Sequence, residues 1–459
     1  MTVLQALRQR LPGSSVRVTR ERALAVVVLL VGAGVWIFAA GLAVGHVGYD
    51  FRSAYLAGAH AIAAGHDPYA VLLQQTPDTR AGSAGLQAHG YVYPPLLATL
   101  LAVPVRLGIS DGVIWLLWNL ANAAIAIWMG RELNLALRAR TDWLASLTFA
   151  TATLIGAVVM YDLYLGQADL LMAALAVIAC GLWLRGNRWA PLVLGVAIAV
   201  KPTMGLLLLV WLYKGDWRAA LRAAGAAVAL LLLPFVLIGP HALFTYLTFM
   251  TGWNGLSASA EYINQSLYGM ILRLVTANAY VRPLLVAPWL VTPLRLLAIG
   301  AALAVWIRAV PRTKTADGAV ALCECLLALP LILLVSPLAE DIHYCLLLPA
   351  LVALVWLAYA RGLSRTPAAI VLYVTLALLC VPRMQELIYP DHLFLFPGQT
   401  NPHIGWLVLL ARSGMLLYTA LATLLAGATL LRAVRAQEQQ PSSALPLLEP
   451  SAAGQTASS

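Results

Sequence analysis

Long apolar runs that are nearly free of charge recur through this chain and restrict it to a membrane fold. The first, from Ala23 to Gly45, contains no charged residue. At about 1.5 Å per helical residue, it can cross a hydrocarbon core about 30 Å thick. Only 10% of all residues are charged and 61% are hydrophobic, whereas soluble domains carry about 25% charged residues. The sequence therefore predicts an all-α polytopic membrane protein with about 10–12 transmembrane helices.

The basic residues predict how the spans are oriented. The net charge of +10 comes from arginines and lysines at the ends of apolar runs, a distribution typical of positive-inside topology. We therefore expect no nucleic-acid partner. The first run follows a basic segment but is too long for a cleaved signal peptide, so it is interpreted as a signal anchor. Loops near Lys214, Arg308 and Arg361 are predicted to be cytoplasmic, and those at 240–283, 336–341 and 383–403 to lie on the opposite side.

Two topologies remain open for the first half of the chain. The expected spans are 142–160, 167–185, 189–212, 217–239, 284–308, 318–336, 342–360, 366–382 and 404–431, with 94–130 interrupted near 108–112. If every run crosses fully, about 12 spans result and two basic loops lie outside. If 94–109 and the Pro202-broken 189–212 are incomplete or re-entrant, about 10 spans place every basic loop inside. The second topology is preferred. Residues 1–435 are predicted to form one transmembrane domain with an outer loop at about 46–93, and 436–459 a disordered cytoplasmic tail.

Asp50 is the leading candidate for chemistry. It follows the first apolar run, and a carboxylate beside the already negative C-terminal end of a helix is unfavourable unless it has a use. The segment from Arg52 to Ala64 has the spacing of an amphipathic helix, with Tyr55 on its apolar face. Asp67 precedes Pro68, where an aspartate commonly makes a turn, although a catalytic role stays open. Tyr93 precedes a Pro-Pro pair and is placed at the water–lipid interface.

Cations near the membrane provide candidates for binding a phosphate. Lys201 lies inside an apolar run and is followed by a helix-breaking proline, although snorkelling to the interface is the alternative. His343 ends the densest polar cluster at a predicted outer helix end and is a candidate to meet a phosphate or leaving group. Arg273 shares an outer loop with Asn264 and Gln265.

Other polar residues have less specific patterns. Gln167 follows Gly166 at a predicted helix boundary, and Asp162 or Asp169 nearby is a candidate to bind a sugar hydroxyl. Asn264 also matches a glycosylation acceptor pattern, which is common by chance. The five cysteines lie in or beside apolar runs, and their spacing completes no zinc site. We expect neither a required metal nor a cofactor.

Taken in order, several short motifs resemble glycosyltransferase family 87, a branch of the GT-C membrane glycosyltransferases. The matching residues are Gly48/Asp50/Phe51, Gly65/Pro68/Tyr69, Tyr91/Tyr93/Pro94/Pro95, Gly166/Gln167, Lys201/Pro202, Asn264/Gln265/Ser266 and Ser336/Pro337/His343/Tyr344. The resemblance covers roughly residues 20–430. In many relatives the late segment has a tryptophan and paired histidines, whereas this chain has Ala339-Glu340-Asp341-Ile342-His343, which puts in doubt any role that needs two histidines there.

The resemblance implies a function at the extracytoplasmic face of the cell membrane, as in a bacterial inner or plasma membrane. A single sugar, usually mannose, would pass from a polyprenyl-phosphate donor to a lipid or glycan acceptor. In an inverting transfer one carboxylate takes the acceptor's proton, for which Asp50 is the candidate. The donor phosphate would be held by Lys201, His343 and Arg273. Substrate would be bound by Tyr55, Asp67, Tyr93, Gln167, Asn264 and Gln265, and membrane lipids would surround the protein. A transporter or flippase for a lipid-linked sugar is the alternative, and a ligase for whole oligosaccharides is a third class.

Overall fold

The computed structural model describes residues 23, 25–34, 37, 47–70, 91–138, 142–256, 260, 264–278, 283–381 and 414–439, without the side chains of 251–256. Every regular element within these ranges is a helix. The all-α polytopic prediction is therefore confirmed for the described part of the chain. The predicted loop residues 71–90 and the tail beyond 439 lie outside these ranges, as does most of the first apolar run, of which 25–34 is helical.

Six helices of the described residues are long and apolar enough to cross a membrane. These are α7 (Asp111–Arg138), α13 (Trp217–Ile238), η4 with α16 (Pro288–Ala309), α17 with α18 (Gly318–Val335), η5 with α19 (Asp341–Ala360) and α23 (Met415–Gln439). A seventh span results if α8 (Trp143–Leu154) and α9 (Ala157–Leu165), which are bent by 80°, count as one. The shorter helices are η1 (Phe51–Leu56), α3 (Ala57–Ala63), α6 (Leu96–Arg106), α10 (Asp169–Leu184), α11 (Ala190–Val200), η3 (Pro202–Gly205), α12 (Leu206–Tyr213), α14 (Pro240–Leu256), α15 (Leu267–Val275) and α20 (Pro367–Leu379).

Several helices begin where the sequence supplies a capping side chain. The side chains of Asp142, Asp216, Asp317 and Thr366 accept backbone N–H groups at the first turns of α8, α13, α17 and α20. Such caps satisfy donors that the helix itself leaves unpaired. The predicted boundaries of these spans consequently lie close to the observed ones.

The apolar segment 189–212 folds into a helical hairpin. Lys201 has an extended backbone between α11 and η3, where Pro202 breaks the helix. The Trp183 indole at the end of α10 donates to the Asp216 carboxylate at 2.9 Å and stacks on Trp211. Because α11 begins shortly after Trp183 and α12 ends near Trp211, both ends of the hairpin lie at the same end of the bundle. This geometry favours the re-entrant topology over a full crossing.

Two predicted boundaries differ in the structure. The helix expected to end near 130 continues as α7 to Arg138, because the buried Glu132 beyond that point is paired with Arg131 and Arg185. Arg131 therefore lies on a helix rather than in a loop. At the other end of the chain, α23 continues to Gln439, past the boundary predicted at 435.

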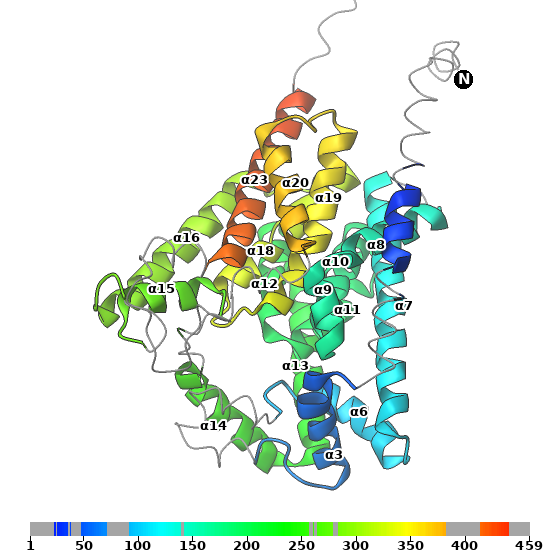
Figure 1. The fold of residues 1–459 in the computed structure, drawn as a ribbon, viewed down its shortest axis with the longest axis vertical. Coiled ribbons are helices and arrows are strands. Elements are labelled where there is room, and N and C mark those ends of the chain that lie inside the picture. Colours follow the sequence, from blue (N-terminus) through cyan, green and yellow to red (C-terminus); the bar gives the residue numbers. More distant parts are fainter. Residues whose placement is uncertain are drawn as a thin grey trace, which may run out of the picture.

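The predicted amphipathic helix at Arg52–Ala64 is present as η1 followed by α3. Tyr55, Ala59 and Ile62 are buried, as expected from their spacing. Figure 1 shows α3 and α6 beside the lower end of the long helix α7, with α19, α20 and α23 grouped toward the upper end. We call the end that carries α3 the Asp50 end of the bundle.

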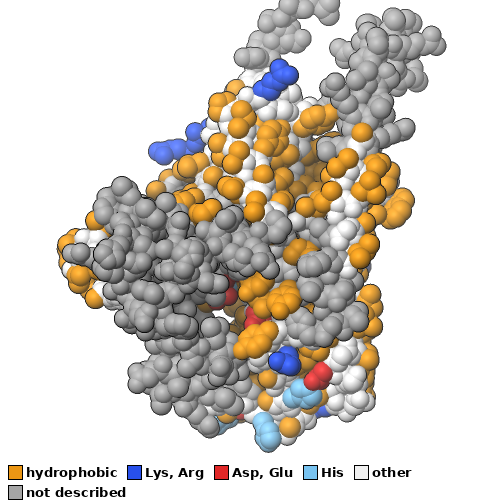
Figure 2. All heavy atoms as spheres, viewed as in Figure 1, with side chains coloured by type: hydrophobic (Ala, Val, Ile, Leu, Met, Phe, Trp, Pro, Cys, Tyr) orange, Lys and Arg blue, Asp and Glu red, His pale blue; other side chains and the backbone are white. Residues whose placement is uncertain are grey.

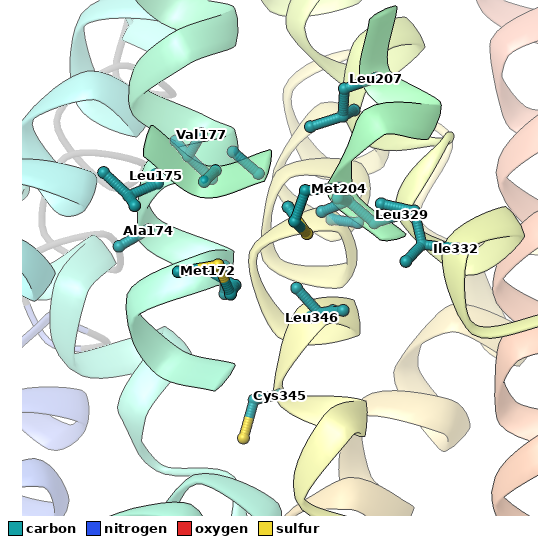
Figure 3. Close-up of a cluster of buried hydrophobic side chains, with 14 of the residues drawn as sticks. Met172, Ala174, Leu175, Val177, Met204, Leu207, Leu329, Ile332, Cys345 and Leu346 are labelled. Carbon is teal, nitrogen blue, oxygen red and sulfur yellow. The ribbon is translucent and has the colours of Figure 1, made fainter. Parts of the chain in front are cut away.

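The apolar core lies around α10, which is buried along nearly its whole length. Met172 of α10 lies on the side of that helix toward Met204 and Leu346, and Leu175 lies on its other side (Figure 3). Packing of this kind leaves little freedom between α10 and the Pro202 hairpin. It therefore fixes the relative positions of the polar groups at the Asp50 end of α10.

Candidate active site

Two glycines bring Asp50 against the turn between α9 and α10. Gly166 ends α9 with φ of +75°, a conformation that favours glycine. A Cβ added there would lie 2.6 Å from the Phe51 Cβ. A Cβ on Gly48 would lie 2.6 Å from the Leu165 carbonyl oxygen. The backbones on either side of Asp50 and of this turn therefore pack directly together.

Gln167 is the centre of a hydrogen-bond cluster. Its Nε2 donates to Asp50 Oδ2 at 2.8 Å, and its Oε1 accepts from the hydroxyls of Tyr55 at 3.0 Å and Tyr93 at 3.1 Å. Asp50 is half-buried, whereas Gln167 is 5% exposed. The three segments predicted separately from Asp50, Tyr93 and Gln167 thus meet at one amide.

The two tyrosines of this cluster are held as hydrogen-bond donors. Their rings stack with centroids 5.0 Å apart and an interplanar angle of 16°. Burial raises the pKa of Tyr93 to about 12, against the opposing effect of Lys201, and burial also raises the pKa of Tyr55. Both hydroxyls therefore stay protonated at neutral pH and can donate to Gln167.

Lys201 lies over the ring of Tyr93. Its ammonium is 5.7 Å from the centroid of the Tyr93 ring and 2.6 Å from Asp169 Oδ2. The Asp169 side chain is fully buried and that of Lys201 is 11% exposed. Rather than extending to the interface, Lys201 is held at the tip of the hairpin, because a buried cation requires a counter-ion. The structure thus places the Asp50 carboxylate against Gln167 and the Lys201 ammonium against Tyr93, the two residues that bond to each other.

The two aspartates predicted as sugar ligands have different surroundings. The carboxylate of Asp162 accepts the backbone N–H groups of Asp169 and Leu170 and so closes the first turn of α10. Asp169 is the partner of Lys201. Both side chains are fully buried within the protein, so their described contacts are with the chain itself.

The segment Glu340–His343 faces the same region from η5. Burial raises the pKa of Glu340 to about 8, and the negative charges of Asp341 and Asp50 add to this effect while Lys201 opposes it. The His343 Nδ1 accepts the backbone N–H of Glu340 at 3.0 Å. His343 also lies within electrostatic reach of Lys201. Glu340 therefore lies near enough to Asp50 to interact with its charge, which was not predicted from the sequence.

Asn264 and Gln265 support this late segment rather than line it. The Asn264 amide donates to the Pro337 carbonyl at 3.1 Å and accepts the Ala339 N–H at 3.2 Å, and the Gln265 N–H donates to the Ala339 carbonyl at 2.8 Å. Both side chains are at most 1% exposed, which also makes Asn264 a poor glycosylation acceptor. The guanidinium of Arg273 donates to the backbone carbonyl of Asn264 at 3.0 Å. These contacts indicate a framework role.

Asp67 belongs to a separate group of contacts. Its Oδ1 accepts the N–H of Tyr69 at 2.8 Å, as in an Asx turn. Its Oδ2 lies 3.2 Å from the exposed His241 ring. The turn expected at Asp67-Pro68 is therefore present.

Of the ten residues predicted for the site, the structure gathers Asp50, Tyr55, Tyr93, Gln167, Lys201 and His343. On the face seen in Figure 2, acidic side chains are visible in a hollow near the centre. The pairing of Asp169 with Lys201 is not among the contacts predicted from the sequence. A signal was available, since each is an ionised residue in an apolar run and two such charges are stable only together.

Comparison with known proteins places this chain among glycosyltransferases. Two relatives, from Mycobacterium tuberculosis (strain ATCC 25618 / H37Rv) and Mycolicibacterium smegmatis (strain ATCC 700084 / mc(2)155), are each named polyprenol-phosphate-mannose-dependent alpha-(1-2)-phosphatidylinositol mannoside mannosyltransferase. Each is 28% identical to this chain, over 59% and 48% of it, and the matched parts span 63% and 49% of those proteins. No solved structure matches. The model of glycosyltransferase family 87 matches residues 91–337, more than half of the sequence, and the chain therefore belongs to that family.

Proposed function

We propose that this protein transfers a single mannosyl residue from polyprenyl-phosphate mannose to a lipid-linked or glycan acceptor at the extracytoplasmic face of the cell membrane. The observation that carries the proposal is a chain of contacts that brings the half-buried Asp50 and the buried Lys201 into one site. Gln167 binds both Asp50 and Tyr93, and the Lys201 ammonium lies over the Tyr93 ring. Family membership supports the reaction class. The names of the two relatives support mannose as the sugar and a phosphatidylinositol mannoside as the acceptor class.

In the proposed reaction, Asp50 acts as general base. The acceptor hydroxyl oxygen attacks the anomeric carbon of the donor, and its proton passes to the Asp50 carboxylate. The bond between the anomeric carbon and the phosphate oxygen breaks, with its electron pair remaining on the lipid phosphate. A single displacement of this kind inverts the anomeric centre and needs no second carboxylate as nucleophile.

Cationic and hydrogen-bonding groups would stabilise the departing phosphate. A phosphodiester becomes a monoester in this step, so negative charge accumulates on its oxygens, where fixed donors are most effective. Lys201 has three N–H donors, and the bond to Asp169 uses one of them. Because the His343 Nδ1 accepts a backbone N–H, the neutral ring carries its proton on Nε2 and presents a donor.

The other predicted residues receive different roles in this proposal. Asn264, Gln265 and Arg273 hold the backbone of the late segment that carries His343. Asp67 makes the turn that precedes Tyr69. We place them outside direct contact with the donor phosphate.

The test is sugar transfer in membranes that contain wild-type protein or the Asp50→Asn variant. The membranes receive polyprenyl-phosphate mannose and a lipid extract, and labelled glycolipid is measured. We expect Asp50→Asn to lower transfer by at least 100-fold, as for removal of a general base, while protein level and membrane insertion stay unchanged. Unchanged transfer by the variant would remove Asp50 from the mechanism.

A transporter of lipid-linked sugar is the second candidate, since broken helices that end near the membrane midplane also occur in transporters. The Pro202 hairpin, with Lys201 between its arms, is the feature that favours it. The same membranes separate the two candidates. Movement of the donor from one leaflet to the other in sealed vesicles, without formation of a new glycosidic bond, would support the transporter function.

A further inference from the structure

The Gln167 amide is engaged at both ends by groups that fix its direction. Two tyrosine hydroxyls approach Oε1, and the Asp50 carboxylate approaches Nε2. An ionised carboxylate accepts hydrogen bonds only, so an amide turned the other way would place two oxygens against each other. Burial of Tyr55 and Gln167 prevents water from substituting for either contact.

We infer that Gln167 is a positioning residue that orients the Asp50 carboxylate, with Tyr55 and Tyr93 fixing the direction of its amide. This inference rests on the proposed function, in which Asp50 takes the acceptor's proton. It changes the role expected for Gln167 from the sequence, because the amide binds the general base rather than the sugar.

The physical reason is that a carboxylate on a short side chain can rotate unless one oxygen is held. The N–H donor at 2.8 Å fixes Asp50 Oδ2, and with it the plane of the whole carboxylate. A charge-assisted hydrogen bond also favours the ionised form, in which the group can accept a proton. General-base catalysis depends strongly on such alignment.

The stacking of the two tyrosines explains why the arrangement needs both. Tyr55 and Tyr93 lie nearly parallel, and Trp118 stacks on Tyr55 with centroids 6.1 Å apart. The Tyr69 hydroxyl donates to the Tyr93 carbonyl at 2.9 Å and holds the segment that carries that ring. The two hydroxyls thus converge on Oε1 from a rigid aromatic cluster.

Other titratable groups face Asp50 and contribute to its protonation. Tyr93, Tyr161 on α9, and Glu340 and Asp341 all interact electrostatically with its charge. These groups stay in place when Gln167 is changed. A shift in the pH dependence of transfer in Gln167→Met therefore reports the loss of the hydrogen bond from Gln167.

The experiment compares Gln167→Met, Tyr55→Phe, Tyr93→Phe and the double tyrosine variant in purified full-length protein. Transfer is measured against donor concentration and pH with polyprenyl-phosphate mannose. Gln167→Met keeps the length of the side chain but removes the N–H donor. We expect kcat to fall about tenfold or more, donor KM to change by less than about threefold, and the acidic limb of the kcat profile to move up by about one pH unit.

The tyrosine variants test the direction of the amide. Each single Tyr→Phe change leaves one hydroxyl on Oε1, so we expect a loss of kcat of about threefold, whereas the double variant should approach Gln167→Met. Asn187→Asp is the matched control, because Asn187 is an exposed amide at the other end of α10. That variant should transfer at the wild-type rate.

The outcomes separate this inference from the function on which it rests. Loss of transfer in Asp50→Asn with a wild-type rate and pH profile in Gln167→Met overturns the inference and leaves the proposed base in place. A fall in kcat for Gln167→Met without a shift of the acidic limb also overturns it, because a structural defect lowers the rate at every pH. Full transfer by Asp50→Asn overturns both.

Discussion

Breaking the Lys201–Asp169 pair should reveal how strongly the tip of the Pro202 hairpin is held. The two charged atoms are 2.6 Å apart, with one side chain fully buried and the other 11% exposed. At an effective dielectric constant of about 20, their attraction is about 6 kcal/mol. Removing one partner of such a pair leaves an uncompensated charge and costs about 3–5 kcal/mol of stability. We therefore expect Asp169→Leu and Lys201→Met each to lower the melting temperature by about 5 °C or more.

The double variant separates pairing from packing. With both charges absent, neither is buried alone, so Lys201→Met/Asp169→Leu should lose much less stability than the sum of the two single changes. Unfolding in detergent can be followed with a thiol-reactive dye, because Cys180, Cys323, Cys325 and Cys345 are all buried. Additive losses in this cycle would refute the pair as a stabilising contact.

A second buried pair provides the control for function. Lys214 and Glu324 are also 2.6 Å apart and nearly fully buried. Lys214 lies near the C-terminal end of α10, whereas Asp169 is the first residue of that helix. Because α10 has 16 residues, its two ends are about 24 Å apart. Lys214→Met should therefore lower stability, by less than Lys201→Met because Arg435 and Thr315 still contact Glu324, while transfer per folded molecule is retained. Transfer lost equally in both sets of variants would contradict a donor-binding role for Lys201.

Three further outcomes follow from particular contacts. The pKa of Glu340 is about 8 in the folded protein and about 4.5 when the chain is unfolded. Stability should therefore decline as pH rises from about 4.5 to 8. Glu340→Gln should make the melting temperature less dependent on pH in this range. His343→Gln keeps an N–H donor near the position of Nε2, whereas His343→Asn keeps only an acceptor near the position of Nδ1. Transfer should therefore be higher in His343→Gln, because the proposed role of the ring is to donate to the phosphate. Higher transfer in His343→Asn would indicate that the bond to the Glu340 N–H is the only role of the ring. Gly166→Ala should cost about 1–3 kcal/mol of stability and lower transfer, because its methyl group would meet Phe51 and Trp115; a wild-type melting temperature and rate would show that this packing is not needed.

Much of the candidate site could be predicted because each of its residues departs from the local pattern. Asp50 and Lys201 are charges beside or within apolar runs, and Gln167 follows a glycine at a helix boundary. The framework roles of Asn264 and Arg273 could not be predicted in this way. Asn264 donates to the backbone carbonyl of Pro337, far along the chain, and Arg273 donates to the backbone carbonyl of Asn264 itself. A residue pattern carries no information about which backbone group a polar side chain will meet.

The sequence by itself determined that this chain is an all-α membrane protein, because runs of apolar residues can satisfy their backbone in lipid only as helices. It also indicated the break at Pro202, since proline lacks the N–H that a helix requires. Only the tertiary structure decided that the broken segment returns to the side it came from, and that Gln167 binds Asp50 and Lys201 binds Asp169. Those contacts depend on how α10 packs between the hairpin and η5, and packing is a property of side chains that meet from separate helices rather than of any one segment.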